Sequence, residues 1–235
     1  MKIICAGDSL TRAQVSADYV ATLRTRIPDA VIVNAGINYE PSGVLASRIA
    51  GLAAQDPDLI TVLTGTNDMR ALLNDNDRAS LRKRWKLTAD PTPDEYRANL
   101  TVIVQTIQHH CRARIALLSP PVIGEELGSA PVRLAGEFAE IVRKVAADQD
   151  VAYLPLYERM TTHLEQSGKR PGTRFRPGMW LASTAATQHF LLRRSFDAIS
   201  RSRGLQLTTD TIHLNTRGAT IIADLIEQEH ARLRR

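Results

Sequence analysis

The stretch Ile3-Ile4-Cys5-Ala6-Gly7-Asp8-Ser9-Leu10-Thr11 decides the fold of this 235-residue chain. Its apolar beginning is typical of a buried β-strand, and its glycine, aspartate and serine are typical of a turn before a helix. We therefore expect Ser9 at the carboxyl end of a strand, above the edge of a sheet, with the amide groups of a helix amino terminus nearby.

Short apolar runs of the same kind alternate along the chain with segments of helical periodicity. The strand-like runs cover residues 2–6, 31–35, 59–64, 114–118 and 151–154, and the helical segments cover about 14–26, 43–54, 94–111 and 132–147. This alternation predicts a parallel sheet covered by helices. Since β-α-β crossovers are right-handed, the simplest topology is a doubly wound, three-layer α/β/α sandwich whose strands share one functional edge.

Length and composition favour one soluble domain over residues 1–235. The chain is 43% hydrophobic and no Pro/Gly/Ser-rich linker divides it. No run of about 18 apolar residues and no signal-peptide pattern is present, so we expect no membrane span and a cytoplasmic protein. Cys5 and Cys111 do not resemble a disulfide framework and are expected to be free thiols. The sequence leaves open whether the protein forms a homo-oligomer.

The basic residues do not indicate a nucleic-acid partner. The formal charge is +5, but the basic residues look spread along the chain, and no zinc finger or other nucleic-acid signature accompanies them. A basic patch over residues 78–86 is the feature that such a partner would use. Nucleic-acid binding is the weakest interpretation of this chain.

The group Asp210-Thr211-Ile212-His213 contains a histidine that can act as the base for Ser9. A serine hydroxyl is a poor nucleophile until a base takes its proton, and histidine, with an ordinary pKa of about 6.5, is best suited to this near neutrality. An aspartate three residues earlier can orient the imidazole ring. The pair indicates a serine hydrolase.

The chain resembles the SGNH, or GDSL-type, hydrolase family at four places in the family's order. These are Gly7-Asp8-Ser9-Leu10-Thr11, Asn34-Ala35-Gly36, Gly65-Thr66-Asn67-Asp68 and Asp210-Thr211-Ile212-His213-Leu214-Asn215. Three of them follow predicted strands. The resemblance implies a flavodoxin-like SGNH hydrolase fold over essentially the whole chain.

The resemblance also implies residue roles. Ser9 would attack an acyl carbonyl, His213 would transfer the proton, and Asp210 would hold the ring in the useful tautomer. The Ser9 and Gly36 backbone N–H groups and the Asn67 side chain would stabilise the oxyanion. No cofactor or metal is implied. The substrate would be a small-molecule acyl ester, and the family includes esterases, lipases, sugar deacetylases and thioesterases.

Two alternatives keep the same fold. An acyltransferase would use the same serine and histidine and pass the acyl group to an alcohol instead of water. A catalytically silent ligand-binding protein would keep the crevice, although the presence of Ser9, Gly36, Asn67 and His213 together argues against it.

The chain departs from the family pattern after the second strand. The family often has another glycine a few positions beyond Gly36, but this chain has Ile37-Asn38-Tyr39-Glu40. The oxyanion loop is therefore expected to have its own shape. We expect Asp8 to anchor its turn through hydrogen bonds to nearby amides, and Asp68 to cap a helix.

Two segments interrupt the alternation. Residues 70–93 are polar and are expected to form a solvated loop or helix. Residues 167–205 begin with several Gly and Pro residues and then become helical, which fits a lid, a wall of the acyl pocket or an ordinary core-packed helix. If the segment covers the pocket, Trp180, Phe190 or Phe196 would line it.

Overall fold

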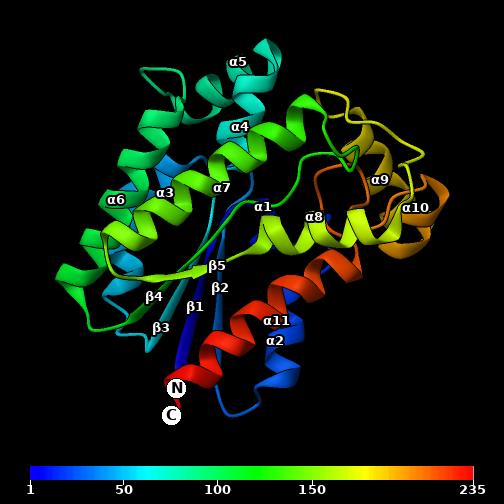
Figure 1. Cartoon of the computed structure of the whole chain (residues 1–235). Helices are drawn as coiled ribbons and strands as arrows, with labels where there is room; N and C mark the ends of the chain where they lie inside the picture. The colour runs from blue at the N-terminus through cyan, green and yellow to red at the C-terminus, as the bar shows by residue number, and fades with distance from the viewer. Residues whose placement is uncertain (235) are drawn as a thin grey trace.

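The structure is a computed structural model that describes residues 1–234, and its centre is a parallel sheet (Figure 1). Five strands lie in the order β2-β1-β3-β4-β5. They are β1 (Lys2–Gly7), β2 (Val31–Gly36), β3 (Leu59–Leu63), β4 (Arg114–Leu118) and β5 (Ala152–Leu154). Each strand matches its predicted run to within one residue at either end. The parallel register and strand order confirm the doubly wound α/β/α sandwich.

Successive side chains of each strand pack against two different layers of helices. In β1, Ile3 and Cys5 belong to one hydrophobic cluster, and Ile4 and Ala6 belong to the other. The first layer holds α2 (Tyr19–Arg26), α8 (Leu156–Ser167) and α11 (Thr216–Leu233), and the second holds α3 (Ser42–Ala53), α6 (Pro93–His110) and α7 (Ala130–Asp148). Because both faces are covered, β3 is buried throughout and β1 is buried from Ile3 onward, and both strands are mostly apolar.

The first predicted helix is shorter than its periodicity suggested. The structure starts α2 at Tyr19 instead of near residue 14, because the preceding residues bind the far end of the chain. Ala17 N donates to Leu214 O at 2.9 Å, and Leu214 N donates to Ser16 Oγ at 2.9 Å. Asp18 then caps α2 by accepting a hydrogen bond from Ala21 N at 2.9 Å.

The remaining helices gather at the carboxyl edge of the sheet, opposite the edge where the amino terminus lies (Figure 1). They are α1 (Ser9–Arg12), α4 (Thr66–Leu73), α5 (Asp75–Trp85), α9 (Trp180–Phe190) and α10 (Phe196–Ser202). The polar segment 70–93 is thus largely helical, and residues 168–179 form an irregular stretch that leads into α9.

Cys5 and Cys111 are free, as expected. Burial raises the pKa of Cys5 to about 11, so this thiol stays protonated and unreactive near neutral pH. Within residues 1–234, no helix is both long enough and apolar enough to cross a bilayer.

Candidate active site

The turn after β1 places Ser9 at the carboxyl edge of the sheet. Asp8 Oδ1 accepts a hydrogen bond from Leu10 N at 2.9 Å, which confirms that Asp8 anchors this turn. Gly7 is required just before it, because a Cβ atom there would lie 2.3 Å from Thr11 Oγ1 and 2.5 Å from Leu63 O. Ser9 is the first residue of α1, where the backbone amide groups have no partner within the helix.

Asp8 itself is almost completely buried. Burial raises the pKa of its carboxyl group to about 7, although the hydrogen bond from Leu10 and the charge of His213 oppose the shift. Its second oxygen, Oδ2, lies 3.5 Å from Asn67 Nδ2. The Asp8 carboxyl group therefore contacts buried polar groups of the protein, Leu10 N and Asn67 Nδ2, beneath the turn that carries Ser9.

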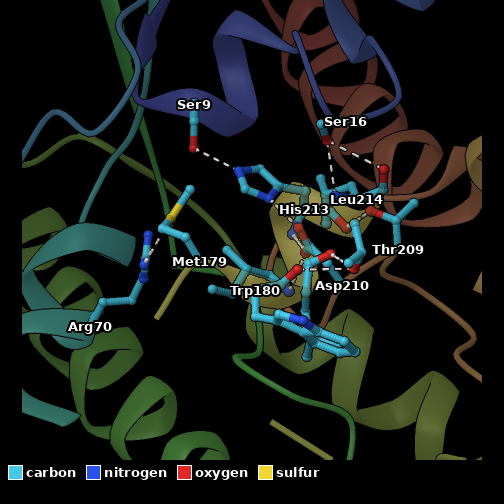
Figure 2. Close-up of polar contacts among 12 residues, drawn as sticks. Ser9, Ser16, Arg70, Met179, Trp180, Thr209, Asp210, His213 and Leu214 are labelled. Carbon is cyan, nitrogen blue, oxygen red and sulfur yellow. Dashed lines mark hydrogen bonds and ion pairs between the residues drawn. The ribbon is translucent and has the colours of Figure 1, made fainter. Parts of the chain in front are cut away.

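Ser9, His213 and Asp210 form a hydrogen-bonded chain (Figure 2). Ser9 Oγ lies 3.3 Å from His213 Nε2, and His213 Nδ1 lies 2.7 Å from Asp210 Oδ2. Residues from opposite ends of the chain meet because β1 and the loop before α11 both reach this edge. This is the order of contacts that a serine nucleophile, its base and an orienting carboxylate require.

The loop that carries Asp210 and His213 is held together by hydrogen bonds between its own residues. Asp210 Oδ1 accepts hydrogen bonds from Ile212 N at 3.0 Å and from His213 N at 2.7 Å. Burial raises the pKa of Asp210, but the charge of His213 and these hydrogen bonds outweigh it and leave the pKa below its ordinary value. Thr211, between them, has a positive φ of 76°, a strained conformation for a β-branched residue. Asp210 is thus held as a carboxylate that faces the ring.

Glu125 fastens the same loop to the body of the protein. The buried carboxylate accepts hydrogen bonds from Gln206 N at 2.6 Å, Leu207 N at 2.9 Å and Thr208 N at 2.8 Å, and from Thr208 Oγ1 at 2.7 Å. Sequence reasoning missed Glu125, because an isolated glutamate more than 80 residues away in sequence carries no motif. Its four hydrogen bonds hold the start of the loop that leads to Asp210 and His213.

Gly36 packs beneath α1, and its N–H group already has an acceptor. The group donates to Asn34 Oδ1 at 3.0 Å. A Cβ atom on Gly36 would lie 2.2 Å from Arg12 N, so the residue must be glycine for packing reasons alone. The structure thus gives this glycine a packing role, and its N–H group is already bound by Asn34.

Asn67 lies beside Asp8 at the start of α4. Its Nδ2 donates to Glu40 O at 3.1 Å and contacts Asp8 Oδ2 at 3.5 Å. The neighbouring Asp68 is buried and caps α3, because its carboxylate accepts hydrogen bonds from Ser42 N at 3.0 Å and Ser42 Oγ at 2.5 Å. Asp68 thus caps a helix, as expected, although the helix is α3 and not its own.

Tyr39 occupies the part of the loop where the family often has a glycine. Its φ is +65°, a conformation that glycine adopts freely and that costs a bulky residue about 1–2 kcal/mol. Trp85 Nε1 donates to Tyr39 O at 2.7 Å, and the guanidinium groups of Arg70 and Arg84 lie 5.2 and 5.5 Å from the Tyr39 ring centre. Within residues 1–234 the Tyr39 N–H group has no hydrogen-bond acceptor.

A pocket of about 210 Å³ opens beside Ser9 and His213. Its surface is mostly apolar, and residues from the loop after β2 and from α9 form its walls. The lining includes Val15, Tyr39, Met179, Ala182, Ser183 and Ala186. In Figure 2, Met179 lies between Arg70 and the Ser9 side of the site. Within the segment 167–205, the residues that line this pocket lie between Met179 and Ala186.

The aromatic residues expected in that wall lie elsewhere. Trp180 is 67% exposed and Phe190 is 60% exposed, and Phe196 stacks on His189 with ring centres 4.0 Å apart. None of the three lines the pocket beside Ser9, which corrects the expectation. Phe196 belongs to α10 and Phe190 is the last residue of α9, whereas Trp180 is turned away by the helical phase of α9. Ala182 and Ala186, four residues apart, share the edge that faces the pocket, and Trp180 lies on a different edge. Small side chains therefore form the wall.

Comparisons with known proteins identify the family. The family described as GDSL-like Lipase/Acylhydrolase matches residues 5–221, so the chain belongs to this family of serine ester hydrolases. A search of curated proteins finds no match.

Solved structures of the same fold include two acetylxylan esterases and a lipase. The acetyl xylan esterase AlAXEase has a TM-score of 0.69 at 18% identity, over 97% of this chain and 99% of that chain. A catalytic mutant of Axe2, an acetylxylan esterase from Geobacillus stearothermophilus, has a TM-score of 0.68 at 17% identity, over 97% and 93%. The lipase/acylhydrolase from Enterococcus faecalis has a TM-score of 0.61 at 19% identity, over 97% and 94%.

Proposed function

We propose that this protein hydrolyses carboxylic esters with small acyl groups through an acyl-serine intermediate. The observation that carries the proposal is the chain of contacts from Ser9 Oγ to His213 Nε2 and from His213 Nδ1 to Asp210 Oδ2, at 3.3 and 2.7 Å. Ser9 and His213 also line a mostly apolar pocket. A nucleophile, its base and a place for an acyl group are therefore adjacent.

The first half of the reaction forms the acyl-enzyme. Ser9 Oγ attacks the ester carbonyl carbon while His213 Nε2 takes the hydroxyl proton. When the tetrahedral intermediate collapses, the carbon–oxygen bond to the alcohol breaks and His213 gives that proton to the departing oxygen. In the second half, His213 takes a proton from water, the resulting hydroxide attacks the acyl-serine, and the carboxylic acid leaves as Ser9 regains its proton.

Three donors are proposed for the oxyanion. The first is the Ser9 N–H group, which is available at the first turn of α1. The second is the side-chain amide of Asn67, which can give up its contact of 3.5 Å with Asp8 Oδ2 and donate to the oxyanion instead. For the third donor, the free N–H group of Tyr39 replaces that of Gly36, which is bound to Asn34. Tyr39 also lines the pocket next to Ser9. A strained residue at this position is consistent with a donor fixed in place before the reaction.

The size of the pocket favours short acyl groups. A volume of about 210 Å³ holds on the order of seven groups of the size of water, less than a drug-sized ligand needs. Two of the structural neighbours are acetylxylan esterases, enzymes named for the acetyl esters they cleave, which agrees with a small acyl group. The alcohol part of the ester would extend out of the pocket.

A panel of esters that vary in acyl length tests the proposal. The protein should cleave acetyl to butyryl esters of a good leaving alcohol, with kcat/KM falling for longer chains, and Ser9→Ala should be inactive on all of them. Adding a competing alcohol and analysing the products separates hydrolysis from acyl transfer. Equal rates for the Ser9→Ala variant and the unchanged protein would overturn the proposal.

A further inference from the structure

The outer face of the α9 region carries large apolar side chains that no other part of the structure covers. Trp180 and Phe190 lie at the two ends of α9, and Leu191 and Leu192, which follow it, are 76% and 65% exposed. Three of these large apolar residues are consecutive in the chain, and such a group of exposed side chains is typical of a binding surface and not of a surface exposed only to solvent.

The same segment concentrates the positive charge of the chain. Residues 168–204 contain eight Lys/Arg and one Asp, a net charge of +7, whereas the rest of the chain contains 22 Lys/Arg and 24 Asp/Glu, a net charge of −2. Basic residues thus occur along the whole chain, as expected, but the excess of positive over negative charge is concentrated in this segment. Six of the eight are exposed: Lys169, Arg170, Arg174, Arg176, Arg193 and Arg201.

A hollow of about 620 Å³ is lined by both basic and large apolar side chains of this segment. Arg174, Arg176, Trp180 and Arg203 are all among the residues that line it. Arg174 reaches Glu126 at 3.1 Å, but among residues 1–234 no carboxylate lies within salt-bridge distance of Arg176. A hollow lined by arginine guanidinium groups and an indole ring suits a phosphate group attached to an apolar body.

This surface borders the pocket that contains Ser9. At 100° per residue, Trp180, Thr187 and Leu191 share the outer face of α9. Ala182, Ser183 and Ala186 lie on the adjoining edge, which lines the pocket. Met179 belongs to both regions, because it is exposed and also lines the pocket. A partner on the outer face would therefore touch the pocket rim.

We infer that the α9 surface docks on an anionic lipid layer and that the enzyme takes an ester from this layer. The exposed leucines and aromatic rings would enter the interface, the arginines would contact lipid phosphates, and the reacting end of the ester would enter the pocket. The second part of this inference rests on the proposed function. The first part, the docking itself, does not.

Charge and shape favour a lipid layer over the other occupants. In a two-fold dimer through this face, two segments of net charge +7 would lie against each other and repel. A single-stranded nucleic acid would use the aromatic rings, but Leu191 and Leu192 have no π-system on which a base could stack. A lipid layer uses all three features, which are the cations, the aromatic rings and the aliphatic side chains.

Vesicle flotation with the Ser9→Ala protein tests the docking without hydrolysis. The protein should float with vesicles of phosphatidylcholine and phosphatidylglycerol, stay behind with phosphatidylcholine alone, and detach as salt is raised. Soluble glycerol phosphate should compete only weakly. Equal flotation with both vesicle types, or none with either, would overturn the inference.

Paired variants locate the surface. Replacing Arg174 and Arg176 with Gln should weaken partitioning about fivefold per removed cation, and Leu191→Ser with Leu192→Ser should weaken it on the order of tenfold. Arg112→Gln and Val102→Ser remove an exposed cation and an exposed apolar side chain from other surfaces, and should leave partitioning unchanged. If the control variants lose as much binding, the α9 surface is not the docking site.

Activity assays separate this inference from the proposed function. In the Ser9-containing protein, the α9 variants should keep kcat/KM for a soluble short ester and lose it for a short-chain ester lipid held in anionic vesicles. Vesicle binding without ester cleavage would overturn the proposed function alone. Cleavage of soluble esters without vesicle binding would overturn the docking alone, as would a concentration-dependent dimer that the leucine variants abolish.

Discussion

The loop over residues 205–215 and the segment over residues 168–195 approach Ser9 from different sides and differ in almost every physical respect. In the loop, Asp210 and His213 are buried, and Glu125 accepts four hydrogen bonds from residues 206–208. The other segment carries exposed apolar side chains at both ends of α9.

Few bonds tie the start of α9 to the body of the protein. Gly178 N donates to Asp77 Oδ2 at 3.3 Å, and Arg203 Nη1 bridges Leu181 O at 3.1 Å and Thr209 O at 2.7 Å. The difference separates two tasks. A proton relay needs fixed distances, which buried hydrogen bonds provide, whereas a substrate wall needs only shape and can stay at the surface.

The largest effect is expected in the proton relay. His213→Ala should lower kcat by about four orders of magnitude or more, because the hydroxyl of Ser9 then has no base. Asp210→Asn should leave more activity, since the aspartate only orients and stabilises the ring. Steady-state kinetics and the pH–rate profile measure both. Equal tolerance of the two substitutions would show that the buried loop is not the relay.

A smaller loss is expected at the oxyanion. Asn67→Ala should lower kcat by about two to three orders of magnitude and change KM little, because its amide would act only on the transition state. Asn99→Ala removes another amide, whose bond is to Ser42 Oγ at 3.0 Å, and serves as the control for lost stability. A change in KM alone would assign Asn67 to substrate binding.

Sequence reasoning predicts the first region better than the second, and the reason is physical. The strand runs and the residues Ser9 and His213 carry local signals, because burial and turn chemistry act on neighbours in the sequence. Glu125 has no such signal, since its role depends on contacts between distant segments. Tyr39 is visible in the sequence only as a departure from the family pattern.

The wall of the pocket illustrates the same limit. The sequence predicts Trp180 as a lining residue, but the helical phase of α9 places Ala186 at the pocket instead. The period of a helix is visible in the sequence, whereas the direction in which the helix faces is set by packing.

Weakening the hydrogen bonds that hold the buried loop should lower kcat less than removing a reacting group does. Glu125→Gln places an NH₂ group against backbone N–H donors, so one or two of these donors lose their acceptor, at about 1–3 kcal/mol. We expect kcat to fall about 10–100-fold with KM nearly unchanged, and Tm to fall. Glu126→Gln, next in the chain, is the matched control. Lower Tm with unchanged kcat would limit Glu125 to stability.

The smallest effect is expected in the α9 wall. Ala186→Leu should fill part of the pocket and lower kcat/KM about tenfold for butyryl esters, but only a few-fold for acetyl esters. Thr187→Leu, on the exposed face, and Trp180→Ala should leave the acyl-length profile of soluble esters unchanged. If Trp180→Ala shifts that profile and Ala186→Leu does not, the assigned wall is wrong.

The nucleophilic role of Ser9 is tested most directly by covalent trapping. The protein is treated with a fluorophosphonate, digested, and analysed by peptide mass spectrometry while ester cleavage is followed in parallel. We predict one modified site, Ser9, with loss of activity in proportion to labelling, and no labelling of Ser9→Ala. Labelling of a different serine together with full ester cleavage by Ser9→Ala would contradict the account.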